Sequence, residues 1–319
     1  MRRKGRRVRA AALFHERPIQ AWQAGQHCIE VFTMNTSSID LNDIDYERRF
    51  GGVARLYGAA ALQRFGQARV CVVGVGGVGS WIVEALARSA IGHLTLIDLD
   101  NLAESNVNRQ IHALTGTLGQ AKVTALHERI GQINPTCVVT EVEDFVDPEN
   151  VEQMLGGGRF DYVIDAIDNV PAKVAMIAWC RKNGMPMVTI GSAGGQIDPT
   201  QIEIRDLCRT EQEPLLAKVR KRLRSQHGFP RGTKNKFHID AVFSTEPLRF
   251  PELAEGEACE IAPAEDLYVG EDAADSTQAG VTGLNCAGFG SAMVVTATFG
   301  LVAAAHVLRK LAEQAAAKP

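Results

Sequence analysis

The stretch that decides the fold is residues 69–110, RVCVVGVGGVGSWIVEALARSAIGHLTLIDLDNLAESNVNRQ. It begins with a short apolar run rich in β-branched residues, which is typical of a buried parallel strand. A helical pattern starts at Ser80, and between strand and helix lies a loop with four glycines, Gly74, Gly76, Gly77 and Gly79. Such a loop lets backbone N–H groups approach a phosphate, and the positive end of the helix dipole favours the negative charge. The stretch therefore predicts the start of a nucleotide-binding βαβ unit.

An acidic residue completes this unit. The next apolar run, residues 94–97, ends at Asp98. A carboxylate about 20 residues beyond the glycine loop meets a ribose hydroxyl in such units. The glycines alone would also fit a unit in which they only allow a helix to pack closely on a strand. Because strand, loop, helix, second strand and acid follow in order, nucleotide binding is favoured.

Further polar residues distinguish this unit from a nicotinamide site, which needs little beyond the ribose acid. Asn106 and Arg109 follow the second strand, Lys122 opens the next helical pattern, and Asp168 follows a later apolar run. Each alone could be a solvated charge at a helix end, and Asp168 could cap a helix that starts near Pro171. Together they suit ATP whose α-phosphate is attacked, because charge on the phosphoryl oxygens requires preplaced cations and a metal-binding carboxylate.

The wider pattern alternates strands and helices. Apolar runs typical of strands are residues 70–73, 94–97, 137–142, 162–165 and 187–190, and helical patterns lie between them at 80–90, 121–133, 148–155 and 171–183. This order predicts an α/β fold with a doubly wound, mostly parallel sheet. Ligands in such sheets bind at the carboxyl ends of the strands, so Gly74, Asp98 and Asp168 are expected to converge on one crevice.

These residues resemble the adenylating domain of the superfamily that activates ubiquitin-like proteins and the sulfur carriers of molybdopterin and thiamine synthesis. Within it, the chain most closely resembles the bacterial enzymes that dehydrate threonylcarbamoyladenosine in tRNA. The segments that carry this resemblance are RFGGVARLYG (49–58), RQIHAL (109–114), RIGQINP (129–135), YVIDAIDN (162–169), GSAGGQIDPTQI (191–202), VFSTE (242–246) and MVVTATFG (293–300).

The resemblance implies a Rossmann-like adenylating core and ATP-dependent activation of a carboxylate. The substrate would be threonylcarbamoyladenosine in tRNA. Its carboxylate would attack the α-phosphate, and the side chain would then cyclise with loss of AMP, so that the net change is loss of water. The main alternative is adenylation of the C-terminus of a ubiquitin-like sulfur carrier, which uses the same nucleotide site. A nucleotide-binding scaffold without turnover and a nicotinamide dehydrogenase are further alternatives.

Roles for individual residues follow from the same resemblance. The loop with Gly74, Gly76, Gly77 and Gly79 would hold the phosphates, and Asp98 would hold the ribose. Charge on the triphosphate would be stabilised by Asn106, Arg109 and Lys122. Asp168 would bind Mg²⁺, and Asn169 would close the site. The expected catalytic residues are Arg109, Lys122 and Asp168.

Partners are also implied. Members of the superfamily form dimers in which an arginine of the N-terminal motif reaches across, and here both Arg49 and Arg55 are candidates. A homodimer is therefore expected. The resemblance leaves open a bound monovalent cation and a cysteine desulfurase or sulfur-acceptor system as a partner.

A basic run lies beyond the nucleotide core. Residues 218–236 read KVRKRLRSQHGFPRGTKNK and contain no acid, in a chain of net charge −3. A solvated helix face is one interpretation, but with the resemblance the run is better explained by contact with tRNA phosphates. Phe229 could then stack on a base. The candidate tRNA-binding residues are Arg220, Arg222, Arg224, Arg231 and Lys234.

The composition of the chain limits the class of protein, the metal and the compartment that can be expected. The chain has 319 residues, of which 45% are hydrophobic and 22% charged, as in a soluble globular protein. Its seven cysteines form no CxxC pair, so no zinc is expected, in contrast to many superfamily members. Reduced thiols of this kind suit a cytoplasmic protein.

We expect four parts along the chain. Residues 1–42 are predicted to be a disordered N-terminal extension, either a basic tail or the product of a start site upstream of Met34. Residues 43–190 form the adenylating core and residues 191–286 a substrate- and tRNA-facing part. Residues 287–319 form a C-terminal apolar helix and tail. Its apolar segment, residues 287–308, has no Asp, Glu, Lys or Arg, and a buried helix is favoured over a membrane span.

Overall fold

The computed structural model describes residues 44–157, 159–250 and 289–316. The predicted extension, residues 1–42, lies outside this range, as does the hypothesis about its start site. Residues 251–286 of the predicted substrate-facing part lie outside it as well.

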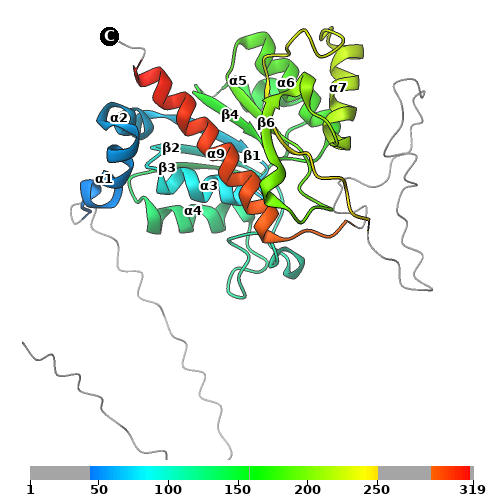
Figure 1. The fold of residues 1–319 in the computed structure, drawn as a ribbon. Coiled ribbons are helices and arrows are strands. Elements are labelled where there is room, and N and C mark those ends of the chain that lie inside the picture. The colour runs from blue at the N-terminus through cyan, green and yellow to red at the C-terminus, as the bar shows by residue number, and fades with distance from the viewer. Residues whose placement is uncertain (1–43, 158, 251–288, 317–319) are drawn as a thin grey trace, which may run out of the picture. The chain divides into compact units, whose positions relative to one another are not determined.

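A seven-stranded sheet forms the centre of the described region, with the strand order β3-β2-β1-β4-β5-β7-β6 (Figure 1). All neighbouring pairs are parallel except the last, in which β6 runs antiparallel to β7. The strands are β1 Arg69–Val73, β2 His93–Ile97, β3 Val138–Val142, β4 Tyr162–Asp165, β5 Met187–Ile190, β6 Ile202–Asp206 and β7 Asp240–Ser244. The predicted doubly wound, mostly parallel sheet is confirmed.

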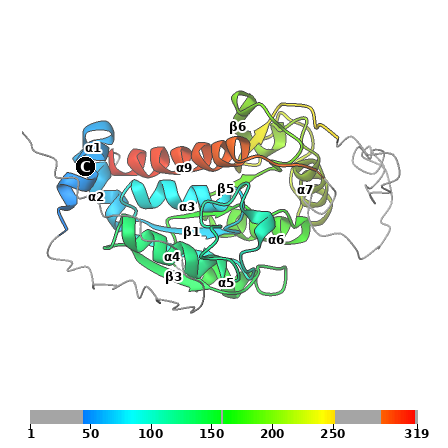
Figure 2. The same ribbon diagram turned by 90° about the horizontal axis from the view of Figure 1, so that it is seen from below.

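Helices cover both faces of the sheet (Figure 2). Val70 and Val72 of β1 lie in one core with α2, α3, α4 and α9, whereas Cys71 and Val73 lie in the other with α5, α6 and α7. This alternation is the period of a strand that is buried on both faces. The helices are α1 Tyr46–Tyr57, α2 Ala59–Gln67, α3 Gly79–Arg88, α4 Lys122–Ile133, α5 Val151–Gly156, α6 Val170–Asn183, α7 Pro214–Gln226 and α9 Met293–Ala316.

The sheet continues past the expected boundary at residue 190. Strands β6 and β7 both belong to the following segment, and β7 pairs directly with β5. Residues 201–206 alternate in the way that is typical of a strand and so indicate β6. The sequence Asp240–Ser244 of β7 shows no clear alternation, and this strand was not expected. The role of residues 191–286 in facing the substrate stays a prediction.

The C-terminal apolar segment forms the long helix α9, which packs on α3 and α2. Among the described helices, this one is long and apolar enough to cross a membrane, but 61% of its most apolar window is buried inside the protein. Gly300 allows the close crossing with α3, since a Cβ there would lie 2.7 Å from the Val78 carbonyl oxygen and 2.9 Å from the Trp81 Cβ. The arrangement agrees with the buried-helix interpretation.

Substitution of Gly300 by alanine should destabilise the protein. The added methyl group would force α9 away from α3, and overpacking of this kind costs about 1–3 kcal/mol. Gly131→Ala in α4 is the matched control, because a Cβ there meets nothing within 4 Å, and it should stabilise by about 0.5–1 kcal/mol. Urea unfolding of both variants measures the difference, and equal stabilities would contradict this account of the crossing.

Candidate active site

A cavity of about 480 Å³ opens at the carboxyl ends of β1, β2, β4 and β5. Nine of the ten residues expected to bind nucleotide line it, namely Gly74, Gly76, Gly77, Asp98, Asn106, Arg109, Lys122, Asp168 and Asn169. They come from three different connections, which follow β1, β2 and β4, as the sheet topology requires. The structure therefore brings together residues that lie far apart in the sequence.

The remaining expected residue, Gly79, is not part of the cavity wall. It begins α3, and a Cβ at this position would lie 1.8 Å from the Gly74 carbonyl oxygen. Gly74 has φ +81°, and a Cβ there would meet Ile167 at 2.7 Å. Both positions need glycine because the loop after β1 passes between the start of α3 and the loop after β4.

Asp98 orients the loop by accepting backbone hydrogen bonds. The Val75 N–H donates to its Oδ2 at 2.8 Å, and the Asp100 N–H donates to its Oδ1 at 3.0 Å. Lys122, at the start of α4, places its Nζ 2.6 Å from Asp100 Oδ2 and 3.7 Å from Asp98 Oδ1. The Lys122 side chain is 8% exposed and that of Asp100 is 73% exposed. An anionic ligand could therefore replace the outer carboxylate as the partner of a preplaced ammonium group.

Arg109 lies across the glycine loop. Its aliphatic stem is 3.1 Å from the position of a Cβ on Gly77, so any side chain at that position would collide with it. Its Nη1 donates to the Ser105 carbonyl oxygen at 2.7 Å, and the Trp81 indole N–H donates to the Arg109 carbonyl oxygen. Partial burial lowers the pKa of Arg109. The guanidinium is thus held beside the cavity by its own segment.

Asn106 also has a local structural partner. Its Oδ1 accepts a hydrogen bond from the Ala103 N–H at 3.1 Å, which closes the short 3-10 turn Glu104–Asn106. The turn precedes Arg109 and sets the direction of the chain there.

Asp168 and Asn169 take different roles at the end of β4. The Asn169 side chain accepts from the Ala172 N–H at 3.0 Å and caps α6, so the interpretation of Asp168 as the cap is wrong. Asp168 is exposed to the cavity and, among the described residues, has no hydrogen bond or ion pair.

This carboxylate fits the way proteins hold Mg²⁺, which keeps several waters and takes one or two carboxylates together with substrate phosphates. Within the described part of the chain, no group of three or more His, Cys, Asp or Glu could hold a metal by itself.

Part of the wall was missed by sequence reasoning. Residues 191–194, Leu215 and Phe145 line the cavity, and Phe145 is 56% exposed. The segment 191–194 was recognised only as a motif, and Phe145 follows β3 without any distinctive pattern. Only the sheet order places these positions beside the glycine loop.

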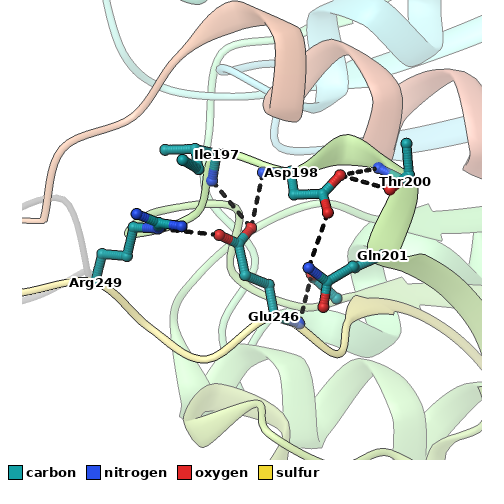
Figure 3. Close-up of polar contacts among 7 residues, drawn as sticks. Ile197, Asp198, Thr200, Gln201, Glu246 and Arg249 are labelled. Carbon is teal, nitrogen blue, oxygen red and sulfur yellow. Dashed lines mark hydrogen bonds and ion pairs between the residues drawn. The ribbon is translucent and has the colours of Figure 1, made fainter.

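Two of the motifs that marked the resemblance are joined by Glu246 (Figure 3). This glutamate is 3% exposed, and it accepts from the N–H groups of Ile197 at 3.0 Å and Asp198 at 2.8 Å. Arg249 donates to its other oxygen at 3.2 Å. Burial opposes ionisation of Glu246, but these hydrogen bonds lower its pKa below the ordinary value. The segments 191–202 and 242–246 therefore form one unit behind the cavity wall.

The basic run divides into two groups. Arg224 stacks over the Phe237 ring at 5.6 Å and donates to the Pro230 and Gly232 carbonyl oxygens, and Arg220 donates to the Thr210 hydroxyl. These two expected tRNA contacts therefore hold the local fold. The exposed members of the expected set are Arg222, Arg231 and Lys234.

Phe229 is also part of the fold at this position. Its ring packs edge-on against Phe237 at 4.9 Å, and the Arg181 guanidinium lies 5.7 Å from its centroid. Stacking on a base would require the ring to leave these contacts.

The two N-terminal arginines lie apart from the cavity wall. Arg49 donates to the Ile133 carbonyl oxygen at 3.0 Å, at the end of α4, and lines a separate basic hollow with Arg88 and Arg129. Arg55 is exposed in the last turn of α1. Neither residue lines the nucleotide cavity of its own chain.

A model described as the ThiF family matches residues 46–319. The chain is 52% identical to the tRNA threonylcarbamoyladenosine dehydratase of Escherichia coli over 85% of its own length and 96% of that protein. It is also 52% identical to the dehydratase of Haemophilus influenzae, over 84% of this chain and 94% of that protein.

A solved structure gives the same match. The crystal structure of the E. coli tRNA N6-threonylcarbamoyladenosine dehydratase in complex with ATP has a TM-score of 0.73 and 49% sequence identity. The match covers 86% of this chain and 98% of that chain.

His112 provides a test of the environment behind the cavity. It is 2% exposed, and neither ring nitrogen has a hydrogen-bond partner within the described residues. Burial, with smaller contributions from Lys122 and Arg129, lowers the pKa of His112 to about 3. Between this value and the unfolded value of about 6.5, the unfolded state binds more protons, so stability falls as the pH falls.

Replacement of His112 by leucine should therefore flatten the acid side of the stability profile. The slope of the unfolding free energy between pH 4 and 6 should decrease by up to about 1.4 kcal/mol per pH unit. Urea unfolding at a series of pH values measures it, with the exposed His227→Leu as control. An unchanged slope would show that His112 is not buried as the neutral form.

Proposed function

The chain belongs to the ThiF family, and from this premise we propose that it is an ATP-dependent tRNA threonylcarbamoyladenosine dehydratase. It adenylates the carboxylate of threonylcarbamoyladenosine in tRNA, and the activated side chain then cyclises with net loss of water. The observation that carries this proposal is the near-full-length similarity to the dehydratases, joined to a cavity with the residues for ATP.

The two chemical steps balance with ATP as the only co-substrate. A carboxylate oxygen of the substrate bonds to the α-phosphorus, and the bond from that phosphorus to the oxygen bridging to the β-phosphate breaks, releasing pyrophosphate. A nucleophile within the same side chain then attacks the activated carbonyl carbon and expels AMP. The oxygen that the substrate loses leaves with AMP, so no free water molecule is released in the second step.

Cations held beside the cavity support the first step. Negative charge on the phosphoryl oxygens grows or shifts during phosphoryl-type transfer, and preplaced positive groups stabilise it without rearrangement. Lys122 is preplaced by Asp98 and Asp100, and Arg109 by the Ser105 carbonyl oxygen. The glycine loop offers its backbone N–H groups, and Asp98 stands at the position that meets a ribose.

Mg²⁺ is the metal that this donor set fits. Asp168 would hold it together with the phosphates of the bound nucleotide. When bound, Mg²⁺ neutralises phosphate charge and orients the leaving pyrophosphate. The homodimer and a sulfur-acceptor partner stay predictions.

The tRNA is expected to lie against the exposed side of α7 and the loop after it. Arg222 lies on α7, while Arg231 and Lys234 follow in the loop, and all three are exposed. The first turn of the same helix contributes Leu215 to the nucleotide cavity. The helix α7 therefore carries a cavity residue at its start and the exposed basic surface near and beyond its end.

The function is tested by incubating the protein with tRNA that carries threonylcarbamoyladenosine, ATP and Mg²⁺, followed by mass spectrometry of the nucleosides. We expect the hypermodified nucleoside to lose the mass of one water, with AMP and pyrophosphate as products. Unchanged tRNA under conditions in which a ubiquitin-like sulfur carrier is adenylated would instead favour the alternative substrate.

With the same modified tRNA as substrate, Asp168→Asn should slow ATP–pyrophosphate exchange by about 100-fold, because the metal loses its protein ligand. The exposed Glu149→Gln serves as the matched control and should exchange normally. Normal exchange by Asp168→Asn would remove this residue from the mechanism.

A triple variant, Arg222→Ala, Arg231→Ala and Lys234→Ala, should bind tRNA more weakly. Each lost phosphate contact should also reduce the slope of log K against log salt by about one. A control that removes three exposed charges elsewhere, Arg48, Arg159 and Lys182, should leave both unchanged. Filter binding over a salt series measures the slopes. Equal slopes in the two triple variants would show that the basic run is a solvated surface and does not contact tRNA.

A further inference from the structure

A buried carboxylate lies directly beneath the cavity. Asp165 is the last residue of β4, and its Oδ1 is 2.9 Å from Nζ of Lys173, with both side chains 0% exposed. The Thr189 hydroxyl donates to its Oδ2 at 2.7 Å, and the Ile167 N–H donates to its Oδ1 at 3.3 Å. The carboxylate therefore ties β5, α6 and the loop of residues 166–169 together, and this loop carries Asp168.

A second buried carboxylate supports the opposite wall. Glu213 caps α7 by accepting from the Leu216 N–H, and its other oxygen accepts from the Ser192 N–H at 2.8 Å. A Cβ on Gly191 would lie 2.9 Å from the Glu213 Cγ, so residues 191–194 rest directly on this side chain. Burial raises the pKa of Glu213, and this shift is opposed first by the hydrogen bonds from the Ser192 and Leu216 N–H groups and then by the positive charges of Lys173 and Arg220. Lys173 thus acts electrostatically on both carboxylates.

Buried charges of this kind are not an efficient way to stabilise the folded state. Replacement of a buried ion pair by apolar side chains of similar volume is often neutral or stabilising. Lys173 also lies in the first turn of α6, where the helix dipole disfavours a cation. These costs indicate that the charges serve the geometry of the cavity above them.

We propose that Lys173 and Glu213 are positioning residues of the nucleotide site. Lys173 acts through Asp165 to set the loop that presents Asp168, and Glu213 sets the wall formed by residues 191–194. Neither side chain lines the cavity, so each acts through the backbone that it holds. The inference rests on the proposed function in one respect, because it takes the ligand of the cavity to be ATP with Mg²⁺.

The first experiment compares ATP binding by calorimetry in Mg²⁺ and in EDTA for the double variant Asp165→Asn and Lys173→Met. This variant removes both buried charges and leaves neither one unpaired. We expect it to fold and to bind ATP in EDTA. The factor by which Mg²⁺ increases its affinity for ATP should be about 10- to 100-fold smaller than in the parent protein. The effect is expected chiefly on Mg²⁺ because the loop with Asp168 is hydrogen-bonded directly to the pair, whereas residues 191–194 are hydrogen-bonded to Glu213.

The control neutralises the contact between the buried His306 and the half-buried Asp240, which are 2.9 Å apart and do not line the cavity. The double variant His306→Gln and Asp240→Asn should shift the thermal midpoint without changing ATP binding in either buffer. A folded Asp165 and Lys173 double variant with the parent's response to Mg²⁺ would overturn the proposal. An unfolded one would also overturn it, because the pair would then serve folding itself.

Glu213→Gln tests whether Glu213 holds the cavity wall formed by residues 191–194. The amide retains one acceptor for the two N–H groups, so residues 191–194 lose their fixed position. We expect the ATP affinity to fall about 10-fold in both buffers, with an unchanged ratio between Mg²⁺ and EDTA. Parent-like affinity would remove Glu213 from the proposal. Failure of the parent protein to bind ATP at all would instead reject the proposed function.

Discussion

The rest of the structure depends on the close approach of three backbone segments at the carboxyl ends of β1 and β4. Gly79 packs against the Gly74 carbonyl, and Gly74 packs against Ala166 and Ile167. A Cβ on either glycine would collide with these neighbours. This packing places the start of α3, the glycine loop and the loop carrying Asp168 around one cavity. A helix N-terminus can favour a phosphate only if it comes this close.

Polar groups around the cavity are prepared for a ligand by the protein's own contacts. Asp98 accepts two backbone hydrogen bonds, and Lys122 and Arg109 are each held by groups of the surrounding loops. Asp168 is the exception among the expected charged residues, since it faces the cavity without a partner in the described chain. Fixed cations and an open carboxylate suit a reaction in which a metal-bound triphosphate is attacked at the α-phosphorus.

Sequence reasoning predicted the first five strands and the convergence of Gly74, Asp98 and Asp168, because apolar periodicity and strand ends are local signals. It missed the supporting residues Lys173, Glu213 and Glu246, since charged residues in a sequence give no sign of being buried. The expected tRNA contacts illustrate the same limit. Arg222 and Arg224 look alike in the sequence, yet only the structure shows that Arg224 is stacked over Phe237.

Residue type and apolar periodicity indicate the fold class, the first five strands in chain order and the chemistry available for ATP, because these are local properties of the chain. The tertiary structure decided which of these groups meet and which of them serve the fold. Gly79 proved to be a packing residue, Asn169 a helix cap and Asp168 the open carboxylate. These distinctions depend on burial and on distances between segments far apart in the chain, which residue order does not contain.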